Sequence, residues 1–163
     1  MIKVAIITVS DKGAQGQRED LSGKTIARML KQIEANIVWY IIIPDELNLI
    51  KTTLIEAIEK HNADLVLTTG GTGLAKRDVT PEATRAVIEK VVPGISEIMR
   101  MENFKKTPHA LLSRAIAGIR DRSLIINLPG SPKGVRESLN LIITALPHAI
   151  DLLKGEASEC GKE

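Results

Sequence analysis

Four short polar runs in this chain contain the glycine, hydroxyl and charged side chains that bind phosphate and metal ions. Each run directly follows a stretch rich in Val, Ile or Leu. The runs are residues 8–11, 44–46, 69–82 and 127–133. In an open α/β sheet, ligands bind beyond the carboxyl ends of the strands. The four runs therefore predict one broad site at the end of a sheet.

The strongest local signal is the glycine-rich turn made by Gly70, Gly71, Thr72 and Gly73. Glycine tolerates positive φ and lets a ligand approach the backbone closely, and successive bare amides form an anion-binding nest. No Gly-Lys-Ser/Thr follows, so the turn is not a Walker loop, and Lys76 stands where the dinucleotide fingerprint needs a third glycine. The pattern alone leaves two interpretations open, a tight turn or a phosphate site.

Two carboxylates, Asp45 and Asp78, follow two different strand-like stretches. Magnesium prefers oxygen ligands and keeps several waters, so this pair predicts a site that holds magnesium against a triphosphate. Each carboxylate also has a purely structural interpretation. In that interpretation, Asp45 forms an Asx turn after Pro44 and caps the next helix, and Asp78 caps the helix that begins near Thr80. For Thr80 itself we favour the role of helix cap.

A second candidate anion site lies where Pro129 and Gly130 lead into Ser131 and Lys133. Backbone amides at a helix start bind anions, but a serine-capped helix with an outward lysine explains the same residues. Two further polar residues, Ser113 and Arg114, precede a strand-like stretch and are uninformative alone. The three histidines, His61, His109 and His148, are not at metal-ligand spacing, and we interpret them as surface or hydrogen-bonded residues.

The segments that must position these residues alternate between strand and helix patterns. Strands buried on both faces are expected at residues 2–9, 37–43 and 64–69. Residues 10–21 are expected to form a loop. Helices are expected at residues 22–35, 47–60, 80–92 and 94–101.

The C-terminal third predicts a hairpin between residues 114–120 and 123–128, and then a last helix that opens at Ser131 and restarts at Pro147. Alternation of this kind predicts a three-layer α/β/α sandwich with a mostly parallel central sheet. We expect a single domain over residues 1–154 and a flexible charged tail over residues 155–163.

Composition excludes several classes of protein. The 163 residues are 44% hydrophobic and 2% aromatic, with a net charge of +2. Few rings and a mild charge argue against nucleic acid as a partner. The single cysteine, Cys160, rules out a disulfide framework within the chain. No apolar run approaches the roughly 20 residues of a membrane span, so we expect a cytoplasmic protein that does not bind membranes.

Taken in order, the motifs resemble those of the molybdopterin adenylyltransferases, including the G domain of gephyrin and its plant counterpart. The resemblance extends from residue 2 to about residue 154. The motifs that carry it are SD at 10–11, DLSG at 20–23, IPDE at 43–46, TGGTG at 69–73, RDVTPEAT at 77–84, LSR at 112–114 and NLPGSPK at 127–133.

The resemblance implies a homotrimer that transfers AMP from ATP to the terminal phosphate of molybdopterin in a magnesium-dependent reaction. It implies the catalytic and metal-binding residues Asp45 and Asp78. It implies nucleotide and phosphate contacts from Ser10, Asp11, Gly70, Gly71, Thr72 and Gly73. It implies molybdopterin contacts from Ser113, Arg114, Pro129, Gly130, Ser131 and Lys133. A molybdenum-insertion protein is a candidate partner.

Two alternatives use the same fold. A non-catalytic molybdopterin carrier or paralogue would keep the glycine turn and the pterin residues but could dispense with the acidic metal ligands. A nucleotide-dependent enzyme of an unrelated pathway is the second alternative, because fold does not determine function. The presence of both Asp45 and Asp78 favours the enzyme.

Overall fold

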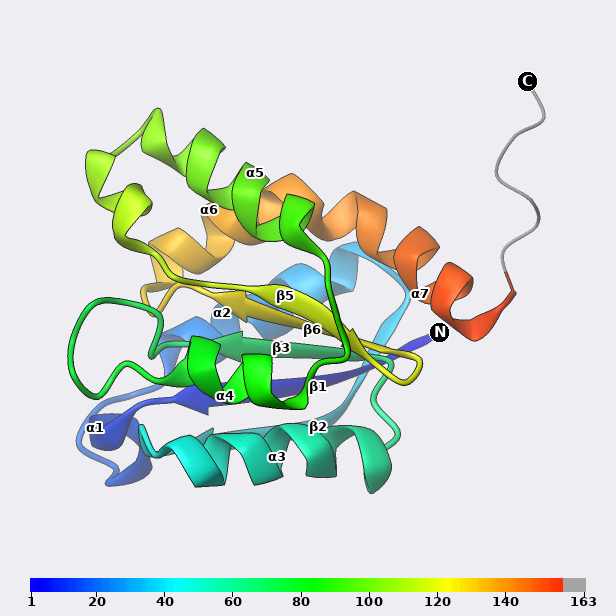
Figure 1. Ribbon diagram of the computed structural model, residues 1–163, viewed down its shortest axis with the longest axis horizontal. Coiled ribbons are helices and arrows are strands. Elements are labelled where there is room, and N and C mark those ends of the chain that lie inside the picture. Colours follow the sequence, from blue (N-terminus) through cyan, green and yellow to red (C-terminus); the bar gives the residue numbers. More distant parts are fainter. Residues whose placement is uncertain (157–163) are drawn as a thin grey trace.

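The chain folds around a six-stranded sheet with the strand order β2-β1-β3-β6-β5-β4 (Figure 1). This is a computed structural model, and it describes residues 1–156. Strands β2, β1, β3 and β6 are parallel, and β5 and β4 extend the sheet antiparallel. The mostly parallel sheet predicted from the sequence is therefore confirmed. The strands are β1 (Ile2–Val9), β2 (Ala35–Ile43), β3 (Leu65–Thr69), β4 (Lys90–Val91), β5 (Ala117–Arg120) and β6 (Ser123–Leu128).

Helices cover both faces of the sheet, as the alternating pattern predicted (Figure 1). Side chains of α2, α5, α6 and α7 pack on one face, and side chains of α3 and α4 pack on the other. The helices are α1 (Asp11–Ala14), α2 (Leu21–Met29), α3 (Leu47–Glu59), α4 (Thr80–Val87), α5 (Pro93–Phe104), α6 (Pro132–Ile142) and α7 (Leu146–Lys154). Single 3-10 turns are η1 (Leu30–Gln32), η2 (Pro108–Leu112) and η3 (Ile143–Ala145).

The core consists of two aliphatic layers, one on each side of the sheet. Alternate residues of a strand point to opposite faces, so Ile6 of β1 joins the layer under α2 and α6 while Ile7 joins the layer under α3 and α4. Both side chains are fully buried. Among residues 1–156, no helix is long and apolar enough to cross a membrane.

The structure corrects the expected burial of the second strand. It lies at the edge of the sheet beside β1 alone, and of its residues only Ile43 is fully buried. An apolar run has the same composition in a central strand and in an edge strand that a helix partly covers. One face of this edge is shielded by a stacked ring pair, because the ring centroids of Trp39 and His61 are 4.2 Å apart.

Three element boundaries also differ from the prediction. The loop after β1 contains the single-turn helix α1, which Ser10 caps by accepting a hydrogen bond from the Gly13 amide. Helix α2 ends at Met29, because η1 redirects the chain into β2. Helix α4 ends at Val87, and the two residues of β4 then pair with β5.

The predicted hairpin is present, although its first strand begins at Ala117 rather than at residue 114, and the last helix follows the prediction. Strands β5 and β6 pair antiparallel. The Ser131 side chain accepts a hydrogen bond from the Gly134 amide at 3.0 Å and so caps α6. Pro147 lies in the first turn of α7, where its missing amide costs nothing. Gly155 ends that helix with φ of 74°, and residues 157–163 of the predicted tail, with Cys160, lie outside the described residues.

Candidate functional site

A cleft of about 700 Å³ lies at the carboxyl ends of the four parallel strands. Its wall includes the ends of β1 and β3 and the segments that follow β2 and β6. Parallel strands end at the same edge of a sheet, which is why segments far apart in the sequence meet there. Of the residues implicated by the sequence, the cleft brings together Ser10, Asp45, Gly70, Gly71, Asp78, Gly130 and Ser131.

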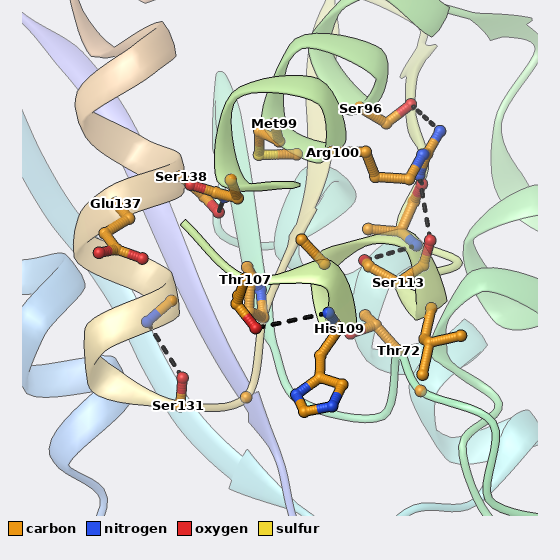
Figure 2. Close-up of a pocket in the computed structure, with 18 of the residues that line it drawn as sticks. Thr72, Ser96, Met99, Arg100, Thr107, His109, Ser113, Ser131, Glu137 and Ser138 are labelled. Carbon is orange, nitrogen blue, oxygen red and sulfur yellow. Dashed lines mark hydrogen bonds between the residues drawn. The ribbon is translucent and has the colours of Figure 1, made fainter. Parts of the chain in front are cut away.

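A second cavity of about 420 Å³ adjoins the cleft, between the glycine turn, α5, η2 and α6 (Figure 2). It is lined by four residues that also line the cleft, namely Gly71, Asp78, Gly130 and Ser131. Its further lining residues from the sequence prediction are Thr72, Gly73, Ser113 and Pro129. The two hollows therefore meet at the carboxylate of Asp78 and the backbone of the glycine turn.

The glycine turn needs glycine at its first two positions. Gly70 has φ of 94° and Gly71 has φ of 66°, a region that residues with a Cβ rarely adopt. A Cβ on Gly70 would collide with the carbonyl oxygen of Val9, and a Cβ on Gly71 would collide with Oγ1 of Thr80. The backbone of β1 and the start of α4 therefore pack directly against this turn.

The prediction that Thr80 caps α4 is wrong in detail. Helix α4 begins at Thr80, the cap position is Val79, and no side chain caps the helix. The Thr80 hydroxyl instead donates a hydrogen bond to the Gly70 carbonyl oxygen at 3.0 Å, and its amide donates to the Gly71 carbonyl oxygen at 3.1 Å. Since Thr80 is fully buried, these bonds fix the turn to the helix that follows Asp78.

Asp45 lies at the entrance of the cleft in a reciprocal pair with Asp11. The Asp11 amide donates to the Asp45 carboxylate and the Asp45 amide donates to the Asp11 carboxylate, both at 3.0 Å. Burial raises the pKa of the Asp45 carboxyl, and the nearby charges of Asp11 and Asp78 act in the same direction. Asp45 is thus a carboxylate held in place next to two others.

Asp11 makes structural contacts beside the cleft, and its nucleotide contact remains a prediction. It does not line either cavity. Arg77 binds it with two hydrogen bonds, Nε to Oδ2 at 2.5 Å and a terminal nitrogen to Oδ1 at 2.8 Å. Hydrogen bonding by Arg77 lowers the pKa of Asp11. The side chain of Asp11 therefore joins the loop before α4, through Arg77, to the segment that follows β2, through the Asp45 amide.

The donor set suits a magnesium ion bound together with phosphate. Asp45 and Asp78 line the same cleft, and the charge of Asp78 contributes to the raised pKa of Asp45. One Asp78 oxygen accepts a hydrogen bond from the Ala75 amide at 2.9 Å. Within residues 1–156, no group of three or more His, Cys, Asp or Glu side chains forms a metal cage. Magnesium typically takes one or two carboxylates and completes its shell with water and substrate phosphates.

Two predicted molybdopterin contacts lie outside the smaller cavity. Arg114 binds the carbonyl oxygens of Gly73 and Asp78 at 2.8 and 2.6 Å and forms an ion pair with Glu82. Its guanidinium therefore holds the loop that carries Asp78. Lys133 is exposed and lines neither cavity. Both ligand contacts remain predictions.

Several lining residues were not proposed from the sequence. Asp20 lines the large cleft and accepts hydrogen bonds from Thr8 and Tyr40, both at 2.5 Å. Asn103 and Ser138, which are joined by a hydrogen bond, line the small cavity from α5 and α6. His109, interpreted as a surface residue, also lines that cavity (Figure 2). DLSG at 20–23 was a signal for Asp20, but nothing local distinguishes Asn103 or Ser138 from other polar helix residues.

Comparison with known proteins gives matches over nearly the whole chain. The family described as "Probable molybdopterin binding domain" matches residues 5–148. A molybdopterin adenylyltransferase of Helicobacter pylori is 47% identical over 156 residues, which cover 94% of this chain and 89% of that protein. Gephyrin of Dictyostelium discoideum is 40% identical, and the match covers 94% of this chain and 23% of that longer protein.

Solved structures agree with this result. The molybdopterin biosynthesis enzyme MoaB of Thermus thermophilus superposes with a TM-score of 0.91 and 48% identity, covering 98% of this chain and all of that one. Fold and cavities together define an α/β protein with two adjoining hollows at the carboxyl ends of its parallel strands. The chain belongs to the molybdopterin adenylyltransferase family, a family of enzymes of molybdenum-cofactor biosynthesis.

Proposed function

We propose that this chain transfers AMP from ATP to the terminal phosphate of molybdopterin in a magnesium-dependent reaction that releases pyrophosphate. The observation that carries the proposal is the junction of two cavities at Gly71, Asp78, Gly130 and Ser131. A transfer between two phosphates needs two binding sites that bring the reacting groups into contact. ATP occupies the large cleft, and molybdopterin occupies the small cavity.

The reaction needs no protein nucleophile. An oxygen of the molybdopterin phosphate attacks the α-phosphorus of ATP, a new P–O–P bond forms, and the bond to the β-phosphate oxygen breaks. The backbone amides of the glycine turn and the α6 N-terminus stabilise charge on the phosphates. Asp45 and Asp78 would hold magnesium, which when bound neutralises charge on the phosphate oxygens.

The two carboxylates differ in which cavities they line, which supports separate roles for them. Asp78 lines both cavities, whereas Asp45 lines only the ATP cleft. Asp78 therefore lies where both phosphates meet, and Asp45 lies beside the leaving pyrophosphate. Arg114 orients Asp78 by binding its carbonyl oxygen.

Pyrophosphate release from ATP and magnesium, measured with and without molybdopterin, tests the proposal. We expect release only with molybdopterin. The Asp78→Asn variant should lose at least about 100-fold in turnover, since it removes charge aimed at the reacting phosphates, and it should still bind molybdopterin. Asp151→Asn on the exposed face of α7 is the matched control and should turn over normally.

The alternatives give different results in the same assay. Molybdopterin binding without pyrophosphate release would identify a carrier or a non-catalytic paralogue. Unchanged turnover in Asp78→Asn would contradict its metal-binding role. Failure to bind either ligand would contradict the proposed reaction as a whole.

We also propose the homotrimer and the molybdenum-insertion partner that the resemblance implies. Exposed apolar side chains support an assembly, and α5 and η2 carry three of them, Met101, Phe104 and Leu111. Apolar side chains at a surface can form part of a protein interface. Light scattering of the purified chain measures the assembly.

A further inference from the structure

The smaller cavity contains a buried amide with an unused hydrogen-bonding atom. Asn103 of α5 is 8% exposed. Its Nδ2 donates to Oγ of Ser138 on α6 at 2.8 Å, whereas its Oδ1 has no hydrogen-bond partner among the described residues. Leaving a buried acceptor unpaired costs about 1–3 kcal/mol. Such a group in a cavity wall is suited to a ligand that supplies a donor.

The location of the Asn103 amide determines which part of a bound substrate it can contact. Asn103 and Ser138 line the small cavity only, whereas Asp78 and Gly71 line both hollows. A substrate whose phosphate lies at the junction must therefore direct the rest of its structure toward α5 and α6. For molybdopterin, the part that remains is the dithiolene-bearing pyran ring and, farthest from the phosphate, the pterin fused to it.

Two acidic residues line the cavity, Asp78 at the junction and Glu137 on α6, and Glu137 is already paired. The Glu137 carboxylate lies 3.5 Å from Nζ of Lys106, and the Glu137 side chain is 20% exposed. Asn103 is therefore the buried acceptor in this wall that lacks a partner within residues 1–156. Because the terminal torsion of asparagine is soft, a small rotation that keeps the hydrogen bond to Ser138 can turn Oδ1 toward a ligand.

We propose that Asn103, oriented by Ser138, recognises the pterin ring by accepting a hydrogen bond from its 2-amino edge. This inference rests on the proposed function, which places molybdopterin in the small cavity. A pterin presents an exocyclic amino group beside a ring N–H, so it offers the donors that Oδ1 lacks. Asn103 is thus a specificity residue that takes no part in the phosphate chemistry.

Titration with two fluorescent probes, 6-hydroxymethylpterin and 6-hydroxymethyllumazine, tests the proposal. The lumazine carries an oxygen in place of the 2-amino group. Wild-type protein should bind the pterin about tenfold more tightly than the lumazine. In Asn103→Leu, affinity for the pterin should fall about tenfold and the preference should vanish, while ATP affinity is unchanged.

Two further variants control for packing. Asn103→Asp keeps acceptor oxygens and should retain the preference for the pterin. Asn140→Leu makes the same change at an exposed position of α6 that lines neither cavity, and it should bind both probes as the wild type does. Equal pterin affinity in wild type and Asn103→Leu would overturn the proposal. If Asn103→Leu fails to fold, absence of the preference in the wild type overturns it.

Turnover separates this proposal from the proposed function. Pyrophosphate release that keeps its KM for molybdopterin in Asn103→Leu would refute the role of Asn103 and leave the reaction intact. A pterin preference that depends on Asn103, without any pyrophosphate release, would refute the reaction and leave the recognition of the ring intact.

Discussion

Asp45 illustrates, at the scale of single residues, how a ligand site opposes stability. Its carboxylate is partly buried and faces Asp11 and Asp78, and these surroundings raise its pKa. A raised carboxyl pKa means that the folded state favours the protonated form, so ionisation of Asp45 weakens the fold as the pH rises through that pKa. Binding of a divalent cation would relieve the same repulsion.

Asp45→Asn should therefore stabilise the ligand-free protein. The amide oxygen can still accept the hydrogen bond from the Asp11 amide, while the unfavourable charge is gone. After allowance for solvent screening, we expect a gain of about 0.5 kcal/mol at neutral pH, or roughly 1–2 °C in Tm. The gain should shrink as the pH falls toward about 4, which thermal unfolding at several pH values measures.

Asp11→Asn is the control with the opposite sign. Hydrogen bonding by Arg77 lowers the pKa of Asp11, so its ionised form stabilises the fold above the ordinary aspartate range and this contribution is lost as the pH falls through the lowered pKa. The variant should melt below the wild type at neutral pH. A lower Tm for Asp45→Asn at neutral pH would contradict the proposed repulsion.

Residues of the site could be predicted from the sequence when they lie in a segment that connects a strand to the next helix. Asp45 and Asp78 come after different strands, and the topology of a parallel sheet brings such positions together. Asn103 could not be predicted in this way. Its place in the wall depends on how α5 packs against α6, and that contact joins residues 35 positions apart.

At the scale of elements, the turn between β3 and α4 connects the sheet to the site. Gly70 and Gly71 both have positive φ, and Thr80 binds the carbonyl oxygens of both. The turn therefore has little freedom to move, although it is made of the most flexible residue type. Its rigidity comes from its neighbours.

Gly71→Ala and Gly16→Ala separate backbone strain from loss of the site. Both glycines have similar φ, 66° and 70°, so the backbone strain of alanine alone should cost about 1–2 kcal/mol at either position, and the collision with Thr80 adds to that cost only at Gly71. Nothing lies within 4 Å of a Cβ on Gly16, whereas a Cβ on Gly71 would lie 3.1 Å from Oδ1 of Asp45 and collide with Thr80. Only Gly71→Ala should lose turnover, by about tenfold or more.

The measurement combines thermal unfolding with pyrophosphate release. A loss of Tm in both variants, larger in Gly71→Ala, with activity lost only in Gly71→Ala, would support the geometry of the turn. Normal turnover in Gly71→Ala would show that the turn does not position Asp45.

The elements themselves were largely predictable, because each strand and helix has its own hydrophobic period. Their ends were less predictable. Helix α4 stops at Val87 so that Lys90 and Val91 can pair with β5, and Gly118 makes room for that pairing. The edge position of β2 depends on strand order, which composition does not encode.

For the whole molecule, the question is whether the two hollows act as two binding sites or as one. They share four lining residues, yet the large cleft follows the strand ends while the small cavity is enclosed by α5, η2 and α6. A ligand that fits one hollow would leave most of the other open. Two ligands without a shared phosphate position should therefore bind together.

Ligand-induced stabilisation distinguishes these cases. A ligand at 100 times its Kd stabilises the folded state by about 2.7 kcal/mol, which for this chain length is roughly 5–10 °C in Tm. Magnesium with ATP and 6-hydroxymethylpterin, each at that excess, should together stabilise the protein by about 5 kcal/mol, the sum of the two effects. A combined shift no larger than that of the better ligand alone would mean that the ligands compete for one site. If the two ligands shift the Tm of the wild type additively, and Asn103→Leu shows only the shift caused by ATP, the pterin binds in the cavity between α5 and α6. The nucleotide then binds in the cleft beside it.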